Sequence, residues 1–128
     1  MSESLLLATN VIIWTVSASN KISKRATMSR STAVLSVSLV SAWEIVLEHQ
    51  AGKLRLKTAT EEVVNQILYH SPWSILPMSS EHLAAVATLP MLHKDPFDRL
   101  LVAQARHEGL TILTADEQIQ AYDVQTIW

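Results

Sequence analysis

Three acidic residues stand at places in this sequence where a carboxylate could take part in chemistry. Glu44 and Asp98 come early in segments with helical character, and Asp116 follows a short apolar run. Oxygen-only clusters of this kind suit Mg²⁺ or Mn²⁺, which bind through a few carboxylates, several waters and substrate phosphates. Each acid also has a structural explanation, since Asp116 could cap the next helix, Asp98 could serve a helix dipole and Glu44 could lie at the surface. The residue pattern alone leaves both interpretations open.

Residues 94–116 contain the elements that would position two of these acids. The helix in this stretch has an N-cap candidate, a proline at its first position, an acid in its first turn and a glycine stop, which are Asp95, Pro96, Asp98 and Gly109. A buried strand, Leu110–Leu113, follows at once and leads to Asp116. In open parallel sheets, ligands bind beyond the carboxyl ends of the strands. The sequence therefore predicts a site at this end of the sheet, with Asp95 acting only as a cap.

Alternation of apolar runs with capped, amphipathic segments predicts the rest of the fold. The expected strands are Leu5–Leu7, Ala33–Val37, Trp73–Met78, Leu110–Leu113 and Val124–Trp128. The expected helices are Val11–Ala18 capped by Thr9 or Asn10, Asn20–Arg30, the segment from Ser38 or Ser41 to Gly52, Thr60–Tyr69, the segment from Ser80 to about Pro90, the helix that begins at Pro96, and Glu117–Tyr122. Right-handed crossovers between these strands predict a single α/β domain, residues 1–128, built as a three-layer α/β/α sandwich around a mostly parallel five-stranded sheet.

Two groups of basic residues suggest nucleic-acid binding, but solvent exposure explains each more simply. The predicted helix Asn20–Arg30 carries four basic residues without interleaved aromatic residues, which favours a solvated face over an RNA-binding one. Lys53, Arg55 and Lys57 alternate with leucines, the period of an exposed strand or extended segment. We expect both groups to face solvent.

Composition excludes several classes of protein. The absence of cysteine removes disulfides and thiol catalysis, and with only Gly52 and Gly109 no glycine-rich loop can cradle a nucleotide phosphate. No two histidines are four residues apart, which argues against a histidine-based metal site. The net charge of −2 does not suit a protein that holds nucleic acid by bulk positive charge. No apolar run approaches the roughly 20 residues of a membrane span, so we expect a soluble protein. The absence of cysteine fits a reducing cytoplasm, so we expect a cytoplasmic location.

Four segments, in order and at suitable spacing, carry a resemblance to a known family. They are Leu5 to Trp14, Val37 to Glu44, His93 to Ala105 and Leu113 to Asp116. Through them, essentially the whole chain resembles PIN-domain proteins of the VapC toxin family, the ribonuclease half of prokaryotic toxin–antitoxin pairs.

The resemblance implies a compact α/β/α fold in which parallel strands bring separate acids together around a divalent metal. The family's second, third and fourth acids match Glu44, Asp98 and Asp116. Thr114 matches a hydroxyl residue that often precedes the fourth acid and helps to hold a ligand or water. The implied cofactor is Mg²⁺ or Mn²⁺, and the implied reaction is hydrolysis of RNA phosphodiester bonds, in which the metal lowers the pKa of a bound water. The carboxylates hold the metal and orient the nucleophile.

The sequence departs from the family pattern at Ala8. The family's first acid ends the first strand, and here alanine takes its place while the residues that follow match the pattern. Because alanine offers no oxygen to a hard cation, we predict that the chain binds metal weakly and cleaves RNA poorly or not at all. A deliberate replacement, made so that a toxic nuclease could be produced, and a natural loss are both compatible with the sequence.

Three functions therefore remain open. The first is a metal-dependent endoribonuclease toxin disabled by Ala8, and the second is a catalytically dead PIN-fold module that engages an antitoxin or RNA without cleavage. A non-nuclease α/β domain whose acids are caps ranks below both. The resemblance also implies partners: a VapB-type antitoxin that plugs the acidic groove with a basic side chain, an RNA substrate, a second copy of the chain in a homodimer, and DNA only through the antitoxin. The candidate contact surfaces are the helices of residues 11–30 and 38–50, with Trp14 or Trp43 if they are exposed.

Overall fold

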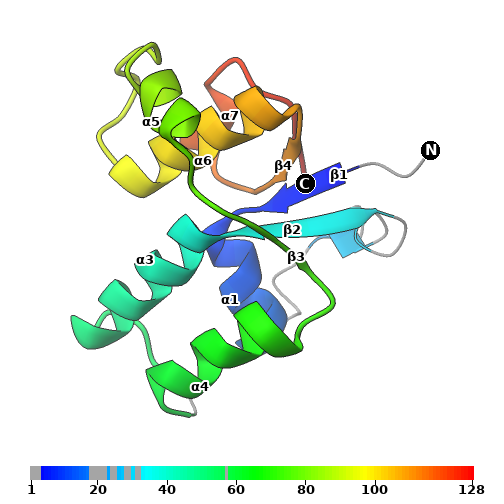
Figure 1. Cartoon of the computed structure of the whole chain (residues 1–128), viewed down its shortest axis with the longest axis vertical. Coiled ribbons are helices and arrows are strands. Elements are labelled where there is room, and N and C mark those ends of the chain that lie inside the picture. Colours follow the sequence, from blue (N-terminus) through cyan, green and yellow to red (C-terminus); the bar gives the residue numbers. More distant parts are fainter. Residues whose placement is uncertain (1–3, 18–22, 24–25, 28–29, 31–32, 57) are drawn as a thin grey trace.

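The computed structural model describes residues 4–17, 23, 26–27, 30, 33–56 and 58–128. Five strands form one sheet in the order β3-β2-β1-β4-β5 (Figure 1). They are β1 (Ser4–Leu7), β2 (Val34–Ser38), β3 (Ser74–Leu76), β4 (Thr111–Leu113) and β5 (Thr126–Ile127). Every neighbouring pair is parallel, which confirms the predicted five-stranded sheet and makes it parallel throughout.

The centre of the sheet is β1, whose leucines are completely buried. Leu5, Leu6 and Leu7 have no exposed surface, as expected for an apolar strand that is covered on both faces. The strand pairs with β2 on one side and β4 on the other, and the Ala8 amide donates a further hydrogen bond to the Leu113 carbonyl at 3.1 Å. The carboxyl ends of these three strands therefore meet at one edge of the sheet.

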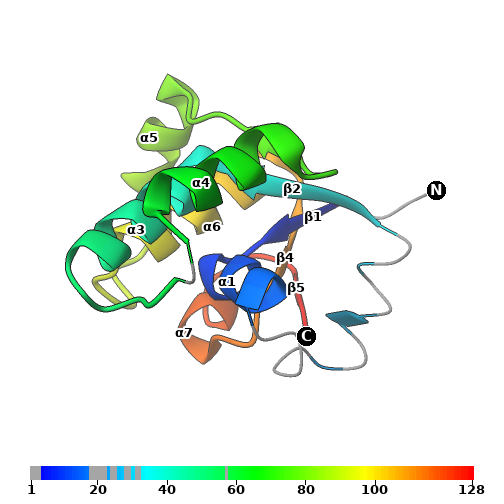
Figure 2. The same ribbon diagram turned by 90° about the horizontal axis from the view of Figure 1, so that it is seen from below.

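Helices cover both faces of the sheet. They are α1 (Thr9–Ser17), α3 (Leu39–Gln50), α4 (Thr60–Asn65), the π-helical turn η2 (Gln66–His70), α5 (Ser80–Val86), α6 (Pro96–Glu108) and α7 (Glu117–Gln120). In Figure 1, α5, α6 and α7 lie on one side of the strands and α1, α3 and α4 on the other, and Figure 2 shows the second group from below. This arrangement confirms the predicted three-layer α/β/α sandwich. Among the described residues, no helix is both long and apolar enough to cross a bilayer.

Capping side chains explain where the main helices begin and end. At the start of α3, Ser38 Oγ accepts an amide hydrogen bond from the first turn, and Asp95 Oδ1 does the same twice at the start of α6. Gly109 ends α6 with a φ of 69°, a left-handed conformation that residues with a side chain avoid. The cap, the first-turn acid Asp98 and the glycine stop predicted for α6 are all confirmed.

The predicted start of α1 is wrong. We expected Thr9 or Asn10 to cap a helix beginning at Val11, but the helix begins at Thr9 itself. The Ala8 carbonyl already accepts the Ile12 amide at 3.1 Å, so Ala8 occupies the N-cap position. An alanine cannot supply a capping oxygen, which is why the sequence did not mark this helix start.

Other predicted boundaries differ from the structure by a few residues. The helix predicted over Thr60–Tyr69 divides into α4 and η2, and the Ser71 hydroxyl donates to the Ile67 carbonyl at 2.7 Å where η2 ends. The helix expected to reach about Pro90 ends at Val86 and is followed by turns. Apolar spacing does not distinguish an α-helical from a π-helical last turn, so the first difference had no signal in the sequence.

The two basic segments have different outcomes. Residues 53–56 form no strand. Their alternation is still visible in the burial, because Lys53 and Arg55 are exposed while Leu54 and Leu56 pack partly against the core. Lys57 lies outside the described residues, as does most of the predicted helix Asn20–Arg30. The prediction for that helix remains untested.

Candidate active site

One cavity lies at the edge where the carboxyl ends of the central strands meet. Its volume is about 350 Å³, and all five predicted site residues line it. These residues are Ala8 after β1, Glu44 on α3, Asp98 on α6, and Thr114 and Asp116 after β4. The parallel sheet thus gathers residues that are up to 108 positions apart in the sequence, as the difference between 116 and 8 shows.

Glu44 is positioned by the direct passage of β2 into α3. Ser38 ends the strand and caps the helix, and its hydroxyl also donates to Gln104 Oε1 on α6 at 2.6 Å. On the other side, Thr9 at the start of α1 donates to Ser41 Oγ at 2.9 Å. These bonds tie the first turns of α3 to both α1 and α6. Glu44, in the second turn of α3, is therefore held at the cavity rather than at the surface.

The environment of Glu44 disfavours its charged form. Desolvation by burial raises its pKa from 4.5 to about 7, and nearby acids such as Glu48 add to the rise, while a hydrogen bond with Thr9 lowers it. Only 8% of the residue is exposed, and its Oε1 atom has no hydrogen-bond partner among the described residues. A buried carboxylate oxygen without a donor is costly, and a proton or a cation would satisfy it.

The environment of Asp98, in the first turn of α6, also disfavours the charged form of its carboxyl group. Burial raises its pKa from 3.8 to about 6, and the charges of Asp95 and Asp116 raise it further. A hydrogen bond with His93, whose Nε2 lies 3.4 Å from Asp98 Oδ2, acts in the opposite direction. The carboxylates of the cavity therefore interact electrostatically with one another.

Asp116 caps a helix, as one of its two interpretations predicted, and it also lies at the cavity. Its Oδ1 accepts the Gln118 amide at 2.8 Å and caps α7, and the residue also lines the cavity. The buried Thr114 hydroxyl accepts the Asp116 amide at 3.0 Å and so fixes the turn between β4 and α7. Because that bond uses the Thr114 oxygen as an acceptor, its proton remains available to a ligand.

Sequence reasoning missed two acids of the cavity. Asp95, predicted only as a cap, caps α6 and also lines the cavity, and Glu48 lines it one helical turn after Glu44. The spacing of four residues between Glu44 and Glu48 placed them on one helix face and could have identified the second acid. With Asp98 and Asp116, five acids surround the cavity, and none of its described lining residues is a lysine or arginine. This pocket is strongly electronegative.

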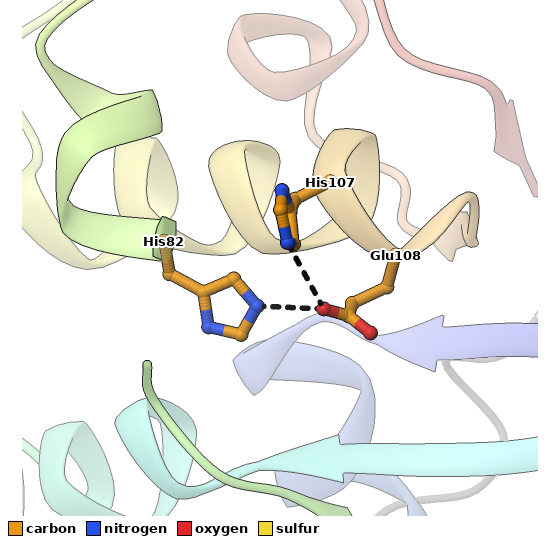
Figure 3. Close-up of side chains that lie close together, drawn as sticks. All are labelled: His82, His107 and Glu108. Atoms are coloured by element: carbon orange, nitrogen blue, oxygen red, sulfur yellow. Dashed lines mark hydrogen bonds and ion pairs between the residues drawn. The ribbon is translucent and has the colours of Figure 1, made fainter. Parts of the chain in front are cut away.

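A second cluster joins α5 to the end of α6 (Figure 3). Glu108 Oε2 lies 3.0 Å from His82 Nε2 and 3.8 Å from His107 Nε2. The ligand atoms of these three residues lie within 4.8 Å of one another, and among the described residues no other three histidine or acidic side chains approach so closely. A search for histidines four residues apart on one helix does not reveal this cluster, because its two histidines lie on different helices.

The hydrogen bonds of His82 fit a structural role better than a metal site. His82 Nδ1 accepts the Ser79 amide at 3.0 Å in a capping box, so in the neutral imidazole the proton is on Nε2 and is donated to Glu108. A metal on Nε2 would move that proton to Nδ1, where it would face the Ser79 N–H. The cluster therefore holds α5 against α6.

Solved structures of VapBC and FitAcB proteins have the same fold as this chain. VapBC2 from Rickettsia felis, bound to a DNA fragment from its promoter, has a TM-score of 0.70 and 14% sequence identity over 97% of each chain. DNA-bound VapBC from Salmonella typhimurium has a TM-score of 0.67 and 14% identity over 99% of this chain and 98% of that one. FitAcB from Neisseria gonorrhoeae has a TM-score of 0.66 and 22% identity over 97% and 96%. At these identities, the similarity establishes the fold.

Sequence comparison supplies the family. No curated protein matches the chain closely enough in sequence to count as a relative. The sequence profile of the PIN domain, however, matches residues 5–125, which include all of β1 except Ser4, strands β2 to β4 and every acid of the cavity. The chain belongs to the PIN domain family.

Proposed function

We propose that this protein is the toxin of a toxin–antitoxin pair, a metal-dependent endoribonuclease of the PIN family that Ala8 has disabled. The observation that carries the proposal is the cavity, in which five acids and no lysine or arginine stand among the described lining residues. RNA is an anion and would be repelled from this pocket unless a cation were bound there. The similarity to VapBC and FitAB complexes supports the assignment to such a pair.

The residues of the cavity fit a hard divalent cation. Glu44 offers a buried oxygen that has no hydrogen-bond partner in the described part of the chain, and Asp98 and Asp116 add two further carboxylates. We propose these three residues as the metal ligands. Bound Mg²⁺ or Mn²⁺ would lower the pKa of a water and neutralise charge on the scissile phosphate. The chain's own part is to hold the three carboxylates, with Thr114 offering its proton to a water or phosphate oxygen.

Ala8 is the weak point of this site. The residue lines the cavity beside the acids but its side chain has no oxygen, so the site has one negative charge fewer than the family pattern. We expect weak metal binding and little or no RNA cleavage from the chain as it stands.

Restoring the acid tests the proposal. Cleavage of labelled RNA is measured for the chain and its Ala8→Asp variant with Mg²⁺, Mn²⁺ or EDTA, and Ala8→Asn is the matched control that adds an oxygen without charge. We expect metal-dependent cleavage by Ala8→Asp at least about 100-fold faster than by the other two, since even outer partners of metal ligands account for about 10–100-fold. Equal cleavage by all three would show that Ala8 is not the lesion. Absence of cleavage by every form would contradict the nuclease proposal.

A binding module is the second candidate, and Ala8 together with an aromatic pair that includes the exposed Trp43 favours it. Trp43 is 58% exposed and packs edge-on against Phe97 with ring centroids 5.2 Å apart, next to the acids of the cavity. We propose that a VapB-type antitoxin covers this surface and places a basic side chain among the acids, in a cytoplasmic homodimer that meets DNA only through the antitoxin. An arginine-containing helical peptide should then bind this surface, and both added salt and the Glu44→Gln substitution should weaken its binding. Binding that changes with neither would count against this surface.

A further inference from the structure

A chain of hydrogen bonds behind the cavity connects Asp98 to a buried arginine. Arg99 is 7% exposed and forms no ion pair with the carboxylates of the described residues. Its guanidinium donates instead to the carbonyls of Pro90 at 2.8 Å and Val86 at 3.5 Å, and to Tyr122 Oη at 3.1 Å. A buried cation paired only with neutral acceptors is unusual enough to require an explanation.

The direction of this chain of bonds follows from the donors available. Arginine can only donate, so Tyr122 Oη accepts from Arg99 and directs its own proton elsewhere. The acceptor within reach is His93 Nδ1 at 2.8 Å. In the neutral imidazole the remaining proton is then on Nε2, which faces Asp98 Oδ2 at 3.4 Å. Because Tyr122 and the His93 side chain are both almost fully buried, water does not compete strongly for these bonds.

We propose that His93 is a positioning residue for Asp98, held in its Nε2–H tautomer by Tyr122 and Arg99. The bond engages one oxygen of Asp98, and the other oxygen has no hydrogen-bond partner among the described residues. We infer that the second oxygen is left for the metal, which rests on the proposed function, in which Asp98 is a metal ligand. Partners that orient a metal ligand commonly govern affinity for the metal, and such bonds are often long before the ligand binds.

The simpler explanation is that Tyr122 and His93 only pack the core between α6 and α7. Their rings lie 5.4 Å apart at an interplanar angle of 60°, and Tyr122 belongs to the main core cluster. Under that explanation the tautomer of His93 and the loss of one hydroxyl would have no consequence for the acid. The two explanations therefore differ in measurable ways.

The first measurement is the tautomer of His93, which requires no metal. Nitrogen NMR of the ¹⁵N-histidine-labelled chain near pH 8 should show His93 protonated at Nε2, with its signals assigned by their loss in His93→Gln. Tyr122→Phe should shift the signals toward a mixture of tautomers, whereas Tyr69→Phe, which removes an exposed hydroxyl, should not. An Nδ1–H tautomer of His93 in the unsubstituted chain, or no change of its signals in Tyr122→Phe, would contradict the proposed chain of hydrogen bonds.

The second measurement is Mn²⁺ affinity in the Ala8→Asp background. We expect His93→Leu to weaken binding about tenfold. His93→Gln should stay close to the parent, because a glutamine amide can donate from nearly the position of Nε2. His70→Gln, at an exposed histidine, is the matched control.

The outcomes separate this inference from the proposed function. Equal loss of affinity in His93→Leu and His93→Gln, or loss in neither, would show that the donor does not matter and would overturn the positioning role. Failure of the Ala8→Asp parent to bind Mn²⁺ would contradict the proposed metal site instead. In that case the tautomer measurement alone decides whether the chain of hydrogen bonds from Arg99 to Asp98 exists.

Discussion

At the scale of single residues, position 8 has two opposed effects on stability. An aspartate there would cap α1, because the Ala8 carbonyl accepts the first helical amide, and a cap contributes about 1 kcal/mol. It would also add a charge beside Glu44, Asp98 and Asp116, at a place where burial and, to a smaller extent, repulsion from neighbouring acids already raise the pKa values of Glu44 and Asp98.

We predict that repulsion exceeds capping when the acids are ionised. Near pH 8, Ala8→Asp should lower the metal-free melting temperature, and Mg²⁺ or Mn²⁺ should raise the melting temperature of the variant more than that of the parent. Calorimetry with and without metal checks both changes, with Ala8→Asn as the control for capping without charge. Identical melting of parent and variant under all conditions would refute the prediction.

Glu44 should make the metal-free protein more stable in acid than at neutral pH. Its pKa rises from 4.5 to about 7 on folding, so within this interval the folded state holds more protons than the unfolded state and stability falls as pH rises. Asp98 acts in the same direction between 3.8 and about 6. After allowance for solvent screening at the cavity mouth, the Glu44 contribution is about 1–2 kcal/mol.

Replacing the acid should remove this dependence. Glu44→Gln should be more stable than the parent near pH 8 and should show a flatter profile of unfolding free energy between about pH 4.5 and 7. Urea denaturation across that range in EDTA provides the measurement. Glu62→Gln, at an exposed glutamate of α4, should leave the slope of unfolding free energy against pH unchanged. If Glu44→Gln had the same slope as the parent chain, Glu44 would not be the source of the pH dependence.

At the scale of elements, a line of buried hydrogen bonds joins three helices. It runs from Ser38 at the start of α3 to Gln104 on α6, then to His82 on α5, and ends at Glu108. The first three of these side chains are almost wholly buried, so removing one member deprives a buried polar atom of its neighbour of a hydrogen bond that water cannot easily replace.

We predict that Ser38→Ala lowers the free energy of unfolding by about 2 kcal/mol, because it removes both the cap of α3 and the partner of Gln104. Chemical denaturation measures the loss. Ser80→Ala, at an exposed serine in the first turn of α5, should change stability by less than about 0.5 kcal/mol. A similar small change in both variants would show that the buried line contributes little.

Local signals predicted the elements better than the contacts between them. The cap Asp95, the stop Gly109 and the apolar run of β1 are local features, and each marked its element correctly. The bonds of His93 to Tyr122 and of His82 to Glu108 join residues 29 and 26 positions apart, so nothing in the sequence pattern marked them. Likewise, the acids were recognised as candidates, but their convergence on one cavity follows from strand order, which local patterns do not determine.

At the scale of the whole molecule, the prediction of a single domain can be tested by its cooperativity. Trp14 lies on α1, Trp43 on α3, Trp73 before β3 and Trp128 after β5, and the rings of Trp14 and Trp128 are 5.7 Å apart. If the chain folds as one unit, urea transitions followed by tryptophan fluorescence and by far-ultraviolet circular dichroism should coincide. A fluorescence transition at clearly lower urea would indicate a part that unfolds separately.

The strand order also has a consequence for synthesis on the ribosome. β1 emerges first among the strands, yet one of its two edges can be paired only by β4, which begins at Thr111. Until then the nascent chain carries a three-leucine strand with a bare edge, the kind of surface that chaperones bind and that promotes aggregation. The cavity acquires its last acid only when Asp116 has been added, so a nascent chain that has not reached Asp116 lacks the complete site and cannot perform its chemistry.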